Sequence, residues 1–241
     1  MTPLVLLHGW LGRGADWDAV RAHLPEVPTH APDLPGHGAA TGLADDAYTM
    51  DGAADRLVAT LDAPAVVCGY SMGGRLAVHL AVRHPDAVAA LVLVSASPGL
   101  ATPEARAARR AVDAERAASL LSDPAAFLDA WYRMPLFGSL SGSARRAMTA
   151  DRLAHVDPAE AARALIGLGT GAQPSHWDDL AGIRVPAWAV AGARDPKFVA
   201  LAHAMAARGP IQPIVVPDAG HTLLAEAPGA LARLLLRTLD V

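Results

Sequence analysis

The sequence predicts an α/β fold in which a mostly parallel, twisted sheet carries helices on both faces and a helical cap is inserted. Short, fully apolar runs alternate with amphipathic runs of helical length, which is typical of parallel strands buried on both faces. The alternation stops at residues 98–182, where no strand pattern occurs, and then resumes. The 241 residues suffice for one large domain with a sizeable core.

Six segments have the apolar pattern of buried strands. They are residues 3–8, 28–31, 64–68, 88–95, 185–191 and 211–216. Amphipathic periodicity predicts helices at residues 16–24, 49–62, 76–83 and about 222–239. We therefore expect a sheet of about six strands.

The chain divides into a core, residues 1–98 and 183–241, and a cap, residues 99–182. The cap segment is rich in alanine, arginine and leucine, and Asp-Pro pairs at Asp123 and Asp157 punctuate it. Ligands of α/β sheets bind at the carboxyl ends of the strands. We expect the cap to lie over those ends.

Composition excludes several classes of function. Hydrophobic residues make up 52% and charged residues 18%, which predicts a globular chain rather than a disordered one. The net charge is −4 and no basic block occurs, so nucleic acid is not expected as a partner. No apolar run has membrane-spanning length and the start lacks a signal-peptide pattern, so no membrane insertion is expected. Cys68 is the single cysteine and lies in an expected strand, which favours the cytoplasm, a reducing compartment. No pattern predicts an oligomeric state.

A candidate nucleophile lies between the strand at 64–68 and the following helix. The sequence Gly69-Tyr70-Ser71-Met72-Gly73 has the G-x-S-x-G pattern of a nucleophile elbow, a sharp turn that exposes a serine. A Cβ atom at either glycine would collide with the neighbouring strand and helix. The turn also directs the backbone N–H of Met72 toward negative charge that forms beside the Ser71 Oγ.

The loop His8-Gly9-Trp10, directly after the first strand, offers the second half of an oxyanion hole. The backbone N–H of Trp10 would face that of Met72. The alternative is a glycine turn with a packed tryptophan.

The acid and the base follow at the ends of two late strands. Asp195 follows the strand at 185–191 and His221 follows the strand at 211–216, which gives the chain order Ser71, Asp195, His221 of a catalytic triad. Asp218 is a competing acid but fits a turn better, and His37, flanked by proline and glycine, fits a structural role. The alternative is a related fold with an inactive site.

With these motifs, the chain resembles the α/β-hydrolase family over essentially its whole length. A narrower resemblance is to the 2-succinyl-6-hydroxy-2,4-cyclohexadiene-1-carboxylate synthase family of menaquinone biosynthesis. The segments that carry it, in order through core and cap, are Gly69–Arg75, Pro98-Gly99-Leu100, Arg106 and Arg109, residues 131–140, Arg152, and residues 192–198.

This resemblance implies an α/β-hydrolase fold and a lyase that eliminates pyruvate without metal or organic cofactor. Ser71, made basic by His221, would remove a ring proton instead of attacking a carbonyl. The implied substrate carries three carboxylates. The partner that the resemblance implies is therefore a small polycarboxylate, which fixed cationic side chains would hold.

Six residues are the substrate-binding candidates that the resemblance implies: Arg75, Arg109, Arg152, Lys197, Trp131 and Tyr70. Arg75 lies four residues after Ser71, within reach of the site, although it could also pair with a surface acid. Lys197 is the only lysine among 20 basic residues, which indicates that this chain uses arginine in place of lysine throughout. The number of arginines is therefore weak support for anion binding. Lys197 could instead fix the loop of Asp195, and Trp131 could simply pack inside the cap.

Two other functions remain open from the sequence. The same triad could hydrolyse a small acidic ester, a thioester or a carbon–carbon bond through an acyl-enzyme. A ligand-binding protein with a vestigial triad is the second alternative.

Overall fold

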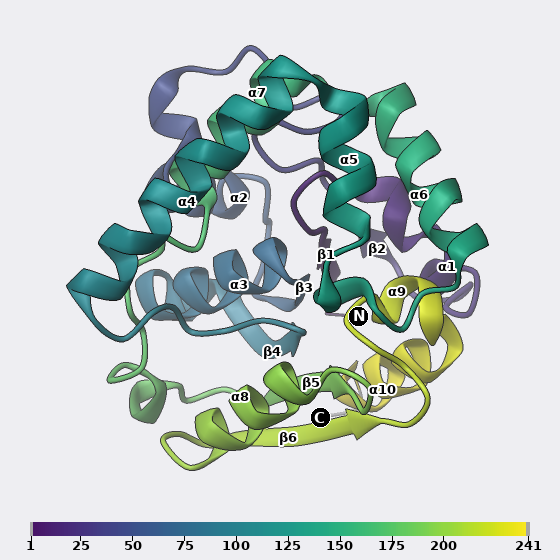
Figure 1. Cartoon of the computed structure of the whole chain (residues 1–241). Coiled ribbons are helices and arrows are strands. Elements are labelled where there is room, and N and C mark those ends of the chain that lie inside the picture. Colours follow the sequence, from purple (N-terminus) through teal and green to yellow (C-terminus); the bar gives the residue numbers. More distant parts are fainter. Residues whose placement is uncertain (1, 240–241) are drawn as a thin grey trace.

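The sheet of this computed structural model has six strands, all parallel, in the order β2-β1-β3-β4-β5-β6 (Figure 1). The structure describes residues 2–239; Met1, Asp240 and Val241, which we assigned to the core, lie outside the described residues. The strands are β1 (Leu4–Leu7), β2 (Thr29–His30), β3 (Ala65–Tyr70), β4 (Val88–Val94), β5 (Ala187–Gly192) and β6 (Ile211–Val216). The six strands predicted from the sequence are confirmed.

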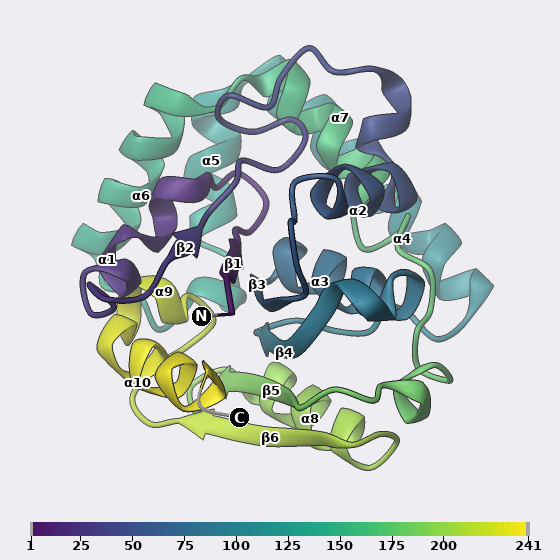
Figure 2. The same cartoon turned by 180° about the vertical axis from the view of Figure 1, so that it is seen from behind.

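The sheet is covered on both faces because its strands are apolar on both faces. Val5 and Leu7 point into one core cluster, whereas Leu4 and Leu6 point into the other, as the two-residue period of a strand requires. The first cluster contains residues of α2 (Met50–Val58), α3 (Met72–Arg83) and α8 (Pro196–Ala206). The second contains residues of α1 (Asp18–Arg21), α9 (Leu223–Glu226) and α10 (Pro228–Leu239), which lie on the opposite side (Figure 2).

Three expected helices are shorter than predicted, and the one expected at 49–62 ends at Val58. The closing helix expected at about 222–239 breaks at Ala227, because the residue before a proline disfavours helical geometry and Pro228 begins α10. The segment 16–24 forms a 3-10 turn, Gly14–Trp17, followed by the single turn of α1. Val20 and Leu24 are nevertheless buried, as the amphipathic pattern predicted.

The edges of the sheet are short or interrupted. β2, at one edge, has two residues, and β6, at the other, contains Pro213 opposite Ala189 of β5. Proline lacks the backbone N–H that a strand donates, and it is typical of edge strands.

Four helices lie between β4 and β5: α4 (Pro103–Ser122), α5 (Pro124–Tyr132), α6 (Gly142–His155) and α7 (Pro158–Leu168). Each begins after a side-chain cap, in order Thr102, Asp123, Ser141 and Asp157, and three of the four start with proline. The Asp-Pro pairs of the sequence are therefore helix starts.

These helices contact the loops at the carboxyl ends of the strands. The Trp10 Nε1, in the loop after β1, donates a hydrogen bond of 2.9 Å to the Ala161 carbonyl of α7. Arg152 of α6 forms an ion pair of 2.6 Å with Asp16, in the same loop. In Figure 1, α4 to α7 lie on the side away from β6. Of the helices within residues 2–239, none combines the length and apolarity needed to cross a membrane.

Candidate active site

Ser71 lies at a strained turn between β3 and α3. Its φ and ψ are 50° and −106°, a conformation that non-glycine residues rarely adopt and that clusters at functional sites. A Cβ atom on Gly69 would lie 2.3 Å from the Gly73 carbonyl oxygen, and one on Gly73 would lie 2.3 Å from the Leu7 carbonyl oxygen. The two glycines thus let β1, β3 and α3 meet at the serine, as the motif predicted.

The structure brings the candidate base and acid together. His221 Nδ1 lies 2.8 Å from Asp195 Oδ2, and both side chains are buried. Asp195 also caps α8 by accepting a hydrogen bond from the Phe198 N–H. The competing acid, Asp218, is exposed and pairs with Arg194 at 3.2 Å. The partner of His221 is therefore Asp195.

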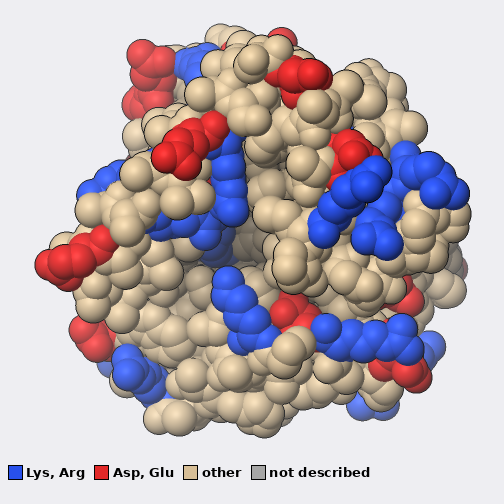
Figure 3. All heavy atoms as spheres, viewed as in Figure 1, with Lys and Arg blue, Asp and Glu red and all other residues tan. Residues whose placement is uncertain are grey.

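Ser71 and His221 line one cavity of about 210 Å³. Of the other candidates, this cavity includes Trp10, Arg75, Arg109, Trp131 and Lys197. Basic side chains border a hollow near the centre of the face shown in Figure 3. Trp131 packs edge-on against Trp10 at 4.9 Å between ring centroids, so it takes part both in the apolar cluster of α4 to α7 and in the cavity wall.

Arg75 is almost fully buried in α3 and faces the carboxyl end of α7. Its Nη1 donates a hydrogen bond of 2.5 Å to the Leu168 carbonyl. Burial and the nearby Arg109 lower the pKa of the guanidinium to about 10, whereas Asp113 opposes that shift. Arg75 therefore remains cationic at neutral pH, and it is not paired with a surface acid.

Arg152 and Tyr70 lie in an adjoining cavity of about 50 Å³, which also touches Ser71 and His221. Arg152 already binds both carboxylate oxygens of Asp16, at 2.8 and 2.6 Å, and Asp151 at 2.8 Å. A ligand carboxylate would share this arginine with two acids. Burial raises the pKa of the Tyr70 hydroxyl, which stays neutral.

Two buried histidines hold the loop that contains Trp10. The His8 Nε2 accepts a hydrogen bond from the Leu34 N–H at 2.9 Å, and the His37 Nε2 accepts one from the Leu11 N–H at 3.1 Å. Their Nδ1 atoms donate to backbone carbonyls. Burial lowers the pKa of His8 to about 4 and that of His37 to about 3, so both are neutral. The expected structural role of His37 agrees with these contacts.

Sequence reasoning missed the acids that pair with the cap arginines. Asp113 accepts from the Arg109 Nε at 2.7 Å, four residues along α4, and this spacing was a usable signal. Asp16 is 136 positions from Arg152, and nothing in the sequence linked the two.

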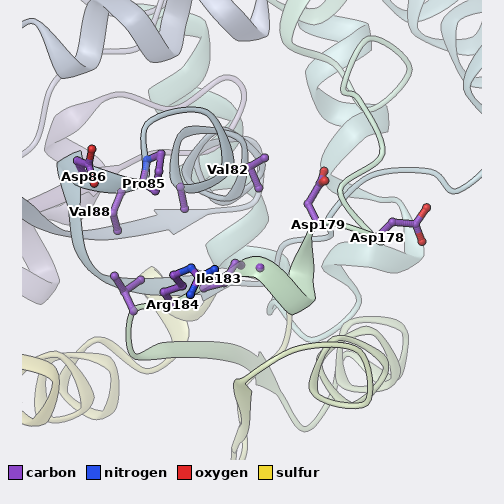
Figure 4. A pocket seen from close by; sticks show the side chains of 11 residues that line it. Val82, Pro85, Asp86, Val88, Asp178, Asp179, Ile183 and Arg184 are labelled. Carbon is purple, nitrogen blue, oxygen red and sulfur yellow. The ribbon is translucent and has the colours of Figure 1, made fainter.

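A larger cavity, of about 650 Å³, is lined by none of Ser71, Asp195 and His221. Val82, Asp86, Val88 and Arg184 are among its lining residues, near the amino ends of β4 and β5 (Figure 4). Because the strands are parallel, this is the end of the sheet opposite to Ser71. Among residues 2–239, no group of three or more histidine, cysteine or acidic side chains could hold a metal ion.

Comparison with known proteins agrees with this geometry. Residues 4–234 match the model of the alpha/beta hydrolase family. The 2-succinyl-6-hydroxy-2,4-cyclohexadiene-1-carboxylate synthase of Enterobacter sp. (strain 638) is 34% identical, over 98% of this chain and 91% of the relative. The structure of MenH from S. aureus superposes with a TM-score of 0.91 at 31% identity, over 99% of this chain and 93% of that one. A thermophilic esterase from Thermogutta terrifontis, with malate bound, gives a TM-score of 0.80 at 27% identity, over 100% of this chain and 90% of that one. The chain therefore belongs to the alpha/beta hydrolase family and, within it, to the family of 2-succinyl-6-hydroxy-2,4-cyclohexadiene-1-carboxylate synthases.

Proposed function

We propose that the protein is a carbon–oxygen lyase of menaquinone biosynthesis. It eliminates pyruvate from 2-succinyl-5-enolpyruvyl-6-hydroxy-3-cyclohexene-1-carboxylate and forms 2-succinyl-6-hydroxy-2,4-cyclohexadiene-1-carboxylate. The observation that carries the proposal is that Ser71 and His221 share one cavity with Arg75, Arg109 and Lys197. Such fixed cations suit a substrate with three carboxylates, whereas a neutral ester would bring no negative charge to them.

In this mechanism, Asp195 orients His221 and Ser71 is the base. The hydrogen bond from His221 Nδ1 to Asp195 leaves Nε2 free to accept the Ser71 proton. The serine oxygen then takes a proton from the ring carbon next to a carbonyl. The electron pair of that C–H bond moves through the ring and breaks the ring carbon–oxygen bond to the enolpyruvyl group. The enolate that leaves takes up the proton held by His221 and becomes pyruvate, so Ser71 and His221 return to their starting states.

The backbone N–H groups of Trp10 and Met72 are proposed to stabilise the oxyanion that develops at that carbonyl. Met72 is the first residue of α3, where the free N–H groups and the helix dipole favour negative charge. The contacts of His8 and His37 support this role for Trp10, because they fix the loop on both sides of it.

The basic residues are proposed to hold the polyanion in its reactive geometry. Arg75 and Arg109 come from α3 and α4, and Lys197 comes from α8, so they approach from three elements. Holding the substrate in its reactive orientation lowers the activation free energy by on the order of several kcal/mol. Arg152 and Tyr70 are proposed to contact the substrate from the adjoining cavity, and Trp131 to form its apolar wall.

We further propose that residues 99–182 act as the cap of this site and that the enzyme works in the cytoplasm. Hydrogen bonds and ion pairs from α6 and α7 to the loop after β1 support the first proposal. The buried, unpaired Cys68 is compatible with the second.

Pyruvate release from the purified protein, followed with the pathway intermediate, tests the function. We expect turnover that is lost in Ser71→Ala and falls roughly ten- to a hundredfold in Arg75→Ala, since a charge-assisted contact contributes roughly 1.5–3 kcal/mol. Arg133→Ala, at an exposed ion pair of α5, is the control and should retain wild-type activity.

A parallel panel of small p-nitrophenyl esters separates the lyase from a hydrolase. The similarity to the Thermogutta esterase makes ester hydrolysis the second candidate. Ester turnover that depends on Ser71, without any pyruvate release, would replace the lyase proposal by a hydrolase of acidic esters. Inactivity in both assays would instead favour a binding protein.

A further inference from the structure

Asp113 is a buried carboxylate in a helix that is otherwise mostly exposed. Its side chain is 3% exposed, and it lies on the face of α4 that is directed at α7. An ionised carboxylate is costly to bury unless it is paired and hydrogen-bonded. The hydrogen-bond partners of Asp113 therefore indicate its role.

Both oxygens of Asp113 are used, and only one of them within its own helix. Oδ1 accepts from the Arg109 Nε at 2.7 Å, and Oδ2 accepts from the backbone N–H of Gly171 at 3.2 Å. Gly171 belongs to the turn that follows α7. This turn lies directly on α4, since a Cβ atom on Gly171 would be 2.6 Å from the Arg110 nitrogen. Asp113 thus joins α4 to the end of α7.

Three parts of the 210 Å³ cavity that Ser71 and His221 line depend on these contacts. Arg109 lines the cavity and is held at its Nε, which leaves both Nη groups for a ligand. The turn held through Gly171 contains Thr170, which lines the cavity, and follows Leu168, whose carbonyl binds Arg75. Arg116 lies 3.7 Å from Asp113 Oδ1 and sits over the ring of Trp131, another cavity residue.

The pair of Arg109 and Asp113 adds little to the stability of α4, in contrast to the acid-first pair of Asp113 and Arg116. In an i,i+4 pair, the acid stabilises a helix better when it precedes the base, whereas Arg109 precedes Asp113. Asp129 of α5 and Arg133, the residue that follows this helix, form an acid-first pair of 2.9 Å at the surface, where both side chains are more than half exposed.

We propose that Asp113 is a positioning residue that orients Arg109 and the Leu168–Gly171 turn, so that Arg109 and Arg75 face one substrate carboxylate or two neighbouring ones. Asp113 does not line the cavity and acts through these residues. This inference rests on the proposed function, because it assumes a polyanionic substrate.

Kinetics of pyruvate release by Asp113→Asn test the inference. The amide of asparagine has the same shape as the carboxylate, but its NH₂ group is a donor. It would face either the Arg109 Nε–H or the Gly171 N–H, which are donors too, so one of the two hydrogen bonds is lost. We expect KM to rise at least about tenfold while kcat changes less than about threefold, since ligand binding loses a pre-oriented charge-assisted contact. The matched control Asp129→Asn should leave both constants unchanged.

A double-mutant cycle shows whether Asp113 acts through Arg109. The KM increase of the double variant Asp113→Asn/Arg109→Ala should be clearly smaller than the product of the two single increases, because the part of the Asp113 effect that acts through Arg109 is already lost in Arg109→Ala. Independent, multiplying effects, or an unchanged KM in Asp113→Asn, would overturn the inference. If Asp113→Asn does not fold, Arg109→Lys replaces it. Lysine keeps the charge but lacks Nε, so KM should rise, and an unchanged KM would refute the inference.

A spectroscopic measurement separates this inference from the proposed function. The Arg109 Nε–H, assigned with Arg109→Lys, should be protected from exchange in 15N-resolved NMR spectra of the wild type and should lose this protection in Asp113→Asn. If the wild type releases no pyruvate but this signature holds, the function fails and the positioning of Arg109 stands. If the wild type releases pyruvate but its Nε–H is unprotected, the function stands and the positioning of Arg109 fails.

Discussion

Acid should destabilise the fold through His8 and His37, the two histidines that hold the loop after β1. Both have a pKa of 6.5 when exposed, and burial lowers the pKa to about 4 and about 3. Between pH 6.5 and the lowered pKa, the two imidazoles are protonated in the unfolded chain but remain neutral in the folded protein. The stability that the neutral rings contribute is therefore complete above pH 6.5 and is lost as the pH falls.

The loss can be worked out from these pKa values. For either histidine, moving from pH 7 to pH 5 lowers the free energy of unfolding by about 2 kcal/mol, and both together lower it by about 4 kcal/mol. This is a large part of the 5–15 kcal/mol typical of a domain. Asp33, which opposes the shift of His8, and Arg152, which adds to both shifts, are the nearby charged groups.

Urea unfolding at pH 7, 6 and 5, followed by tryptophan fluorescence, measures the effect. His37→Asn should lower stability at pH 7 but make the drop between pH 7 and 5 smaller by about 2 kcal/mol, since one titrating group is gone. His203→Asn, at an exposed position of α8, should keep the full drop. The reasoning is refuted if the wild type loses no stability between pH 7 and 5, or if His37→Asn loses as much as the wild type.

Three further predictions concern the loop, the elbow and the core. Asp16→Asn leaves Arg152 paired with Asp151 alone and should cost about 2 kcal/mol in urea unfolding, whereas Asp18→Asn, in an exposed pair, should cost less than about 0.5 kcal/mol; equal costs would contradict the buried pairing. Gly73→Ala should abolish pyruvate release or folding because its Cβ would meet the Leu7 carbonyl, whereas Gly182→Ala, with open space around it, should be tolerated in both activity and expression. Cys68 is fully buried and burial raises its pKa, so a thiol reagent should modify it only as fast as the protein unfolds; a rapid reaction under native conditions would show that β3 opens locally.

The strands and the order of the triad could be predicted because each depends on local sequence. Continuous apolar runs, such as that of β4, have few alternatives to a buried strand. Once the sheet is parallel, all strands end at the same edge, so Asp195 and His221 are brought toward Ser71 without any knowledge of distances. The elbow follows equally from its two glycines.

The pairing of the cap arginines could not be predicted, because it depends on how the cap helices pack. The sequence offered Arg109 and Arg152 as equal candidates. In the structure, Arg109 lines the larger of the two cavities at Ser71, whereas Arg152 is bound to Asp16 across the boundary between α6 and the loop after β1. The break at Pro228 was visible in the sequence, but the apolar periodicity on both sides of it concealed the change of helix.

The interrupted edges of the sheet limit how copies of this chain could associate. A strand from a neighbouring molecule would find only two residues to pair with at β2, and a missing donor at Pro213 of β6. Unprotected edges are a common route to aggregation, and short strands and prolines are among the ways in which natural proteins block it. Growth of one continuous sheet through two molecules is thereby disfavoured. The helical surfaces are the better place for any self-association. The interrupted edges also protect this chain, with its 52% hydrophobic residues, from fibre-like assembly.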